Sequence, residues 1–250
     1  MIGTVTLRKT EQYITCFGIK YTIYCIFSDY CDSPIFLEEY LTMAFSNQLS
    51  ALRKIGRKAV LPTNKIQSIV LSKWGGKSNQ DDISTVIDFG AGTLYWSYWF
   101  AKQYRDAKIY AVDSYYAKHK EPVIDTYKKR IILLSDLQQC NKIRSDFDIL
   151  WCCDVIHHLD NEWRKNLFDF IKQNDIKEVI IKDIDCRHKI GNFMNKFHDR
   201  IINHEKVKDV DSIKITKKLQ DMGYEVSYRY IPKLWYSHFI LISRKRNYKR

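Results

Sequence analysis

The residues best suited to chemistry lie in one short stretch, Asp88-Phe89-Gly90-Ala91-Gly92. A run of β-prone residues from Thr85 to Ile87 leads into it, and the segment 96–104 that follows can form a helix. Glycine lacks a Cβ and tolerates positive φ, so it lets main chain approach a ligand closely. A helix N-terminus adds N–H groups without intrahelical partners. The pattern predicts a strand, loop and helix that hold a nucleotide-like cofactor.

Polar residues also end the next three apolar runs. Asp113 ends the run from Lys108, Ser135 and Asp136 follow the run 130–134, and Asp154 follows the run 146–153. Ligands of open α/β sheets bind outside the carboxyl ends of the strands, and an acid in the position of Asp113 binds ribose hydroxyls. We therefore expect one crevice to collect Asp88 and these later acids. Asp113 also fits a purely structural role as a helix N-cap.

The composition is that of a globular chain. Its 250 residues, 45% of them hydrophobic, suit one enlarged domain or a domain with an added subdomain. The net charge of +12 favours anionic partners such as nucleic acid, phospholipid or phosphorylated metabolites, or it is spread diffusely over the surface. Seven cysteines without framework spacing indicate a reducing compartment. With no signal peptide or membrane span evident, we expect a soluble, cytoplasmic protein.

A polar, glycine-containing linker at 74–82 suggests a boundary between an N-terminal extension, 1–80, and a larger domain, 81–250. In the extension, the segments 5–7, 13–17 and 21–27 favour strands and 36–52 favours a helix. The larger domain alternates strands with helical segments, which predicts a parallel sheet. Strands are expected near 85–89, 108–113, 130–134, 147–153, 177–183, 224–230 and 236–243. A tight connection containing Pro232 makes the last two an antiparallel hairpin.

This α/β arrangement, a Rossmann-like, mostly parallel sheet of seven strands with the last strand antiparallel, resembles the class I S-adenosylmethionine-dependent methyltransferases over roughly residues 84–246. The resemblance implies S-adenosylmethionine as cofactor. It places Asp88, Gly90 and Gly92 along the methionine part, Asp113 on the ribose, Asp136 at the adenine and Asp154 facing the sulfonium. Their neighbours complete the implied cofactor site: Phe89, Ala91, Ser114, Ser135 and Cys153. Leu94 stands where the family has a third glycine, a departure that also disfavours a dehydrogenase.

A second set of elements resembles a bacterial subgroup of the same family. The elements are Asp154-Val-Ile-His-His158, Lys182-Asp183-Ile-Asp185, His198-Asp199 and Ser237-His238. The resemblance implies a catalytic group of His158, Lys182, Asp183, His198 and His238. His158 suits a general base, and Lys182 with Asp183 suits the orientation of a hydroxyl. Each histidine also fits a structural role: a helix cap for His158, a tie between helix and sheet for His198, and core packing for His238.

A metal site is the less favoured alternative for the same acids. Asp154, Asp183 and Asp185 could gather around Mg²⁺, which prefers oxygen ligands. Lys182 beside them would oppose a cation, so no metal is expected.

The leading hypothesis is methyl transfer to an oxygen or nitrogen of a small molecule, glycan or lipid head group. An RNA methyltransferase, possibly of the ribose 2′-O, is the alternative supported by the charge, the basic segment 53–58 and the aromatic residues among basic ones at 229–236. A non-catalytic binding or regulatory subunit with the same fold is the second alternative. The sequence leaves the acceptor and the oligomeric state open.

Overall fold

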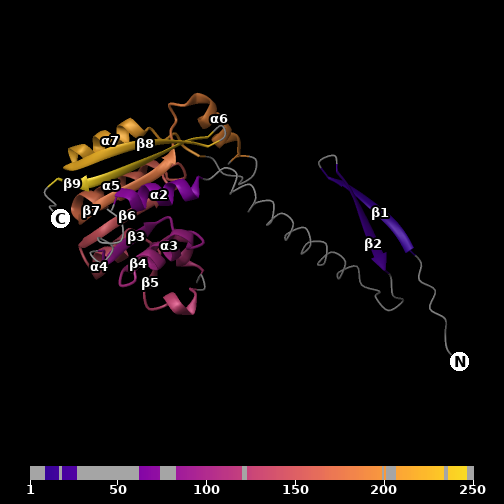
Figure 1. The fold of residues 1–250 in the computed structure, drawn as a ribbon, viewed down its shortest axis with the longest axis horizontal. Coiled ribbons are helices and arrows are strands. Elements are labelled where there is room, and N and C mark those ends of the chain that lie inside the picture. The colour runs from indigo at the N-terminus through magenta and orange to yellow at the C-terminus, as the bar shows by residue number, and fades with distance from the viewer. Residues whose placement is uncertain are drawn as a thin grey trace. The chain divides into compact units, whose positions relative to one another are not determined.

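The computed structural model describes residues 9–16, 19–26, 62–73, 83–119, 123–198, 200, 207–233 and 236–246 (Figure 1). The chain divides into two compact units, residues 1–56 and 57–250. The predicted helix at 36–52, the basic segment 53–58 and the linker at 74–82 lie outside the described residues, as does the predicted strand at 5–7.

The first unit contains a β-hairpin. Strands β1 (Lys9–Cys16) and β2 (Ile19–Ile26) pair antiparallel, in a register that runs from Lys9 opposite Ile26 to Cys16 opposite Ile19. Their β-branched and aromatic residues suit a pleated ladder.

The second unit is built on a seven-stranded sheet. Its strands are β3 (Thr85–Phe89), β4 (Lys108–Val112), β5 (Ile131–Leu134), β6 (Asp146–Cys153), β7 (Asp175–Ile184), β8 (Tyr224–Lys233) and β9 (Tyr236–Lys245). The spatial order is β5-β4-β3-β6-β7-β9-β8, with β9 antiparallel to both of its neighbours and the pairs among β3 to β7 parallel. This confirms the predicted mostly parallel sheet with a reversed last strand.

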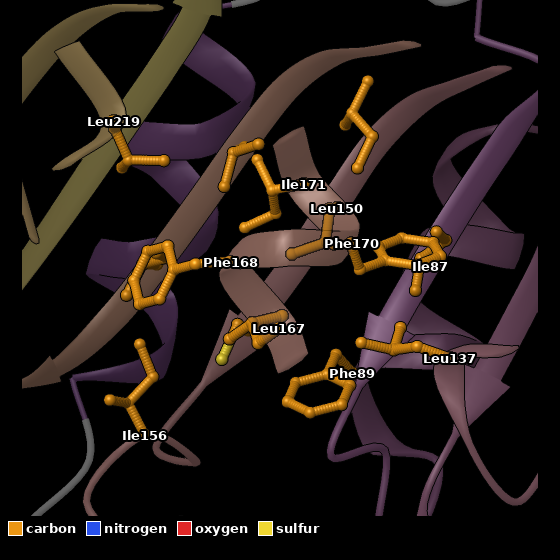
Figure 2. Close-up of a cluster of buried hydrophobic side chains, with 14 of the residues drawn as sticks. Ile87, Phe89, Leu137, Leu150, Ile156, Leu167, Phe168, Phe170, Ile171 and Leu219 are labelled. Carbon is orange, nitrogen blue, oxygen red and sulfur yellow. The ribbon is translucent and has the colours of Figure 1, made fainter. Parts of the chain in front are cut away.

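Helices pack on the sheet through two apolar clusters of side chains. The helices are α2 (Thr63–Lys73), α3 (Tyr95–Gln103), α4 (Leu137–Ile143), α5 (Asn161–Gln173), α6 (Lys189–His198) and α7 (Ser212–Asp221), and 3₁₀ turns lie at Ser114–Ala117 and Asp125–Tyr127. The strand period of two sends Ile87 and Phe89 into the cluster beneath α4, α5 and α7 (Figure 2), and Val86 into the cluster that includes α2 and α3. Within the described ranges, no helix is long and apolar enough to cross a bilayer.

Ile66 and Val70 of α2 are buried in the same cluster as Val86 of β3, within the second compact unit. One detail differs from the sequence-based expectation. Pro232, expected in the connection between the last strands, lies inside β8 opposite Ser237. A proline is tolerated there because β8 is an edge strand, where a missing N–H need not break the ladder.

Candidate functional site

The loop after β3 is held against the neighbouring strand by main-chain bonds. The N–H groups of Gly90 and Ala91 donate to the carbonyl oxygen of Val112, at 2.8 and 3.2 Å. Gly90 has φ +75°, and a Cβ there would overlap both methyl groups of Val155. Gly92 has φ +48°, and a Cβ there would meet no atom within 4 Å. The first glycine is thus required by packing, whereas the second opens onto free space.

Leu94 takes the backbone conformation that the missing third glycine would take. Its φ of 62° lies in the left-handed region, and its side chain is fully buried in the core. Helix α3 begins at the next residue, and no side chain caps it. The turn into the helix is therefore preserved, although a leucine stands in a position that favours glycine.

Asp113, at the end of β4, points toward this loop. One carboxylate oxygen, Oδ2, accepts from the N–H of Gly92 at 2.9 Å, and the other, Oδ1, accepts from the N–H of Tyr115 at 2.9 Å. The hydroxyl of Tyr116 donates to the carbonyl oxygen of Gly92 at 2.6 Å. Asp113 therefore caps the following 3₁₀ turn, which begins at the exposed Ser114, and also fixes the glycine loop.

Three of the proposed cofactor residues turn their side chains away from the loop's open face. Asp88 is 1% exposed and accepts from the hydroxyl of Ser97 in α3 at 2.6 Å. Burial raises the pKa of Asp88 to about 7, against the opposing effect of the bonds from Ser97. Phe89 and Ala91 are buried in the two core clusters. Phe89 and Ala91 can face a ligand only with main chain, and Asp88 instead ties β3 to α3.

Ser135 and Asp136 form a small polar group at the end of β5. Asp136 caps α4 by accepting from the N–H of Gln139 at 3.0 Å, and it also accepts from the hydroxyl of Ser135 at 3.0 Å. Both residues are half-buried. Their oxygen atoms lie at the end of β5, one strand beyond Asp113.

Asp154, directly after β6, has a buried cation as its partner. Lys182 of β7 is fully buried and donates from Nζ to both carboxylate oxygens, at 2.5 and 2.6 Å. Burial raises the pKa of Asp154, but the charge of Lys182 and the nearby His238 and His157 outweigh it, so the pKa lies below its usual value. Asp154 also has φ +56°, an unusual conformation for a residue other than glycine. The half-buried Cys153 places its Sγ 3.7 Å from the same carboxylate.

The histidine that meets Asp183 is His157, which the sequence reasoning passed over in favour of its neighbour. His157 is 5% exposed, and its Nδ1 lies 2.6 Å from Oδ1 of Asp183. Facing a carboxylate oxygen, which accepts when ionised, Nδ1 is the donor of this pair. His158 is exposed, with its ring 4.0 Å from that of His157. The doubled histidine was the available signal, but sequence alone does not tell which ring turns inward.

Hydrogen bonds fix the loop that carries His157. Lys208 donates its main-chain N–H to the carbonyl oxygen of His157 at 2.7 Å. Arg164 of α5 donates to the carbonyl oxygens of Ile156 and Asp209, at 3.0 and 2.9 Å. The main chain is therefore bonded at Ile156 and at His157 itself, which restricts the position of the ring.

The remaining candidates fall into different surroundings. His238 is buried in β9, with its ring stacked 5.7 Å from that of Tyr236, and it lies near enough to Asp154 to lower the pKa of that acid. His198 ends α6, and its side chain, like Asp199, lies outside the described residues.

The three acids considered for a metal each have a separate partner. Asp154 pairs with Lys182, Asp183 with His157, and Asp185 with Arg187, whose Nη2 lies 2.6 Å from Oδ2. Across the described part of the chain, no group of three His, Cys, Asp or Glu residues is arranged to hold a metal ion.

Comparison with known proteins identifies the class of fold to which the larger unit is similar. No model of a known protein family matches the sequence, and no curated protein matches it. Similar solved structures include magnesium protoporphyrin IX methyltransferase from Synechocystis PCC 6803, with 17% identity and a TM-score of 0.52 over 73% of this chain and 80% of that one. A second is 1,6-didemethyltoxoflavin-N1-methyltransferase from Burkholderia thailandensis, with 12% identity and a TM-score of 0.53 over 94% of this chain and 98% of that one. A third, a SAM-dependent methyltransferase from Archaeoglobus fulgidus, has 14% identity and a TM-score of 0.52 over 72% and 99%. The larger unit therefore has the Rossmann-like fold of the S-adenosylmethionine-dependent methyltransferases.

Proposed function

We propose that this chain is an S-adenosylmethionine-dependent methyltransferase. The observation that carries the proposal is the approach of the Asp113 carboxylate to within 2.9 Å of the Gly92 N–H, at the carboxyl ends of β3 and β4. The strand order reverses beside β3, and such a switch point is where doubly wound sheets bind nucleotides. The Synechocystis and Burkholderia neighbours were crystallised with S-adenosylhomocysteine, which supports the same cofactor here.

The chemistry of the side chains fits that cofactor. Each oxygen of Asp113 accepts one main-chain N–H and keeps a lone pair for a ribose hydroxyl. The open space beside Gly92 lets a ligand approach the main chain. Asp136 and Ser135 supply oxygen atoms one strand further on, where the amino group of an adenine would need an acceptor. Bound there, S-adenosylmethionine would supply an activated methyl group.

Residues at the ends of β6, β7 and β9 form the proposed acceptor side. In this proposal His157 and Asp183 act together on the proton of the acceptor, with Asp183 holding the imidazole ring and stabilising its charged form. Lys182 and Asp154 orient the acceptor, and His238 borders the same pair. A site of this kind needs mainly to align the acceptor and exclude water. It suits an oxygen or nitrogen of a small molecule, glycan or lipid head group. In addition to this group, His158 and His198 remain candidate catalytic residues in the proposal.

Calorimetry with S-adenosylmethionine tests the proposal. Gly92→Val fills the open space and is expected to abolish binding. Gly223→Val is the matched control, because Gly223 also has positive φ and no atom within 4 Å of a Cβ, but it precedes β8. The control is expected to bind as the unaltered protein does. Absence of binding by folded protein, or equal loss in both variants, would refute the proposal.

A second measurement distinguishes methyl transfer from cofactor binding alone. Protein with labelled S-adenosylmethionine is mixed with cell extract for a single turnover, and the extract is then fractionated into small molecules, lipid and RNA. A methyltransferase moves label into one of these fractions. A non-catalytic subunit would bind the cofactor and move none.

A further inference from the structure

Helix α6 presents a row of large apolar side chains to solvent. Ile190, Phe193 and Phe197 are 75%, 64% and 53% exposed, and their spacing places them on one face of the helix. The rings of Phe193 and Phe197 stack at 6.4 Å. An amphipathic helix normally turns this face to the core. Here α6 packs on β9 and β7, and among the described residues the row remains exposed.

Further exposed apolar side chains lie on β8 and α7, the two elements that the turn before α6 contacts. His188, just before α6, stacks on Tyr230 at 4.8 Å, and Tyr228 lies two residues earlier on β8. Arg187 reaches the hydroxyl of Ser212 at 2.8 Å, at the start of α7. The apolar patch, as we define it, comprises Ile190, Phe193, Phe197, Ile213, Tyr228 and Tyr230. These are six of the eleven exposed large apolar side chains among the described residues, so exposure is concentrated here.

Basic residues flank the helical part of the patch. Lys189 and Lys214 are exposed and lie next to Ile190 and Ile213 in the chain. The nearby acid Asp209 is neutralised by Lys196 at 2.7 Å. Asp185 is buried beneath Arg187. A surface of apolar side chains edged by cations complements an anionic lipid surface, in which rings and aliphatic chains enter the headgroup region.

We propose that the apolar patch docks on an anionic membrane, with α6 lying in the interface. RNA is a poorer match, because Ile190 and Ile213 offer no ring on which a base could stack. The patch adjoins the proposed acceptor side, since α6 follows the strand that carries Lys182 and Asp183. Docking therefore presents that side to the bilayer and indicates an acceptor drawn from lipid. This last step rests on the proposed methyltransferase function, whereas docking itself does not.

Sedimentation with vesicles tests the docking. The full chain is mixed with vesicles of phosphatidylcholine alone, or of equal parts phosphatidylcholine and phosphatidylglycerol. It is expected to pellet with the mixed vesicles and to bind less at high salt, because charge attraction is screened. The double variant F193S/F197S is expected to bind about tenfold more weakly. The control Ile143→Ser removes a side chain of similar exposure, 48%, from α4 and is expected to bind unchanged.

Four outcomes would overturn the proposal. They are absence of pelleting with mixed vesicles, equal pelleting of the double variant, release from vesicles by competing RNA, and a dimer in solution that the double variant dissolves. The last outcome would mean that a second copy covers the patch. S-adenosylmethionine calorimetry on the same preparations separates failure of docking from failure of the methyltransferase proposal, because the double variant should keep cofactor binding.

Discussion

At residue 94, backbone strain and side-chain burial act in opposite directions on stability. The left-handed conformation costs a residue with a side chain about 1–2 kcal/mol. Burial of a leucine contributes about 3–5 kcal/mol, judged by the cost of truncating it to alanine. Burial is therefore the larger effect, and it explains how Leu94 replaces glycine at the start of α3.

This balance predicts an unusual order of variants. Leu94→Ala loses the buried side chain and keeps the strain, whereas Leu94→Gly loses both, so the glycine variant should be the more stable by about 1 kcal/mol. In the middle of α5, Leu167 is equally buried, and there alanine should be the more stable replacement by about 1 kcal/mol. Urea denaturation of the four variants measures both differences. The same order at both positions would contradict the left-handed conformation of Leu94.

The carboxyl group of Asp88 makes stability depend on pH. Burial raises its pKa from 3.8 to about 7, so between these values the folded chain keeps a proton that the unfolded chain releases. Stability then falls as pH rises through this range, by as much as about 4 kcal/mol, and changes no further above it. Asp88→Asn keeps an oxygen that accepts from Ser97 and removes the ionisation. The variant should gain stability over the unaltered protein as pH rises from 4 to 7, whereas a constant difference across this range would contradict the raised pKa.

At the scale of elements, a buried charge fixes the pairing of the reversed strand. Glu178 of β7 lies opposite Arg244 of β9, and Oε1 of the glutamate accepts from Nε and Nη2 of the arginine at 2.9 and 2.7 Å. Glu178 is almost completely buried, while Arg244 is partly exposed. A slip of β9 by one residue would separate the two, so the pair opposes other registers.

Removal of the arginine alone should therefore lower the free energy of unfolding more than removal of both partners. Arg244→Met leaves a buried carboxylate without its cation and is expected to lower the free energy of unfolding by about 3 kcal/mol. The double variant Glu178→Leu with Arg244→Met should lose less, because no buried charge remains. Denaturation of the two single variants and the double variant gives the coupling energy. If the losses of stability in the two single variants add up to that of the double variant, the ion pair does not stabilise the pairing of β7 with β9.

At the scale of the whole molecule, the sequence predicted the sheet well because each strand is an apolar run that ends at a polar residue. Asp113, Asp136 and Asp154 mark these ends, and the periodicity between them is unambiguous. The same pattern predicted the edge at which the candidate residues gather. The reversed strand followed from the short connection between the last two runs, which permits only an antiparallel pair.

Other features depend on contacts that no local pattern encodes. His157 and His158 are the same residue type side by side, and only the fold turns the first toward Asp183. Asp88 reads as a ligand from its motif, but the position of Ser97 in α3 determines that it is buried. The row on α6 is seen to face solvent only once the packing of α6 on β9 and β7 is known.

The bonds that hold the glycine loop to β4 have a kinetic consequence. Gly90, Ala91 and Gly92 are each tied to Val112 or Asp113 before any ligand arrives. A preorganised loop has little conformational freedom to lose on association. Stopped-flow mixing with cofactor should therefore give an observed rate that rises linearly with concentration, without the plateau produced by a slow rearrangement of the protein.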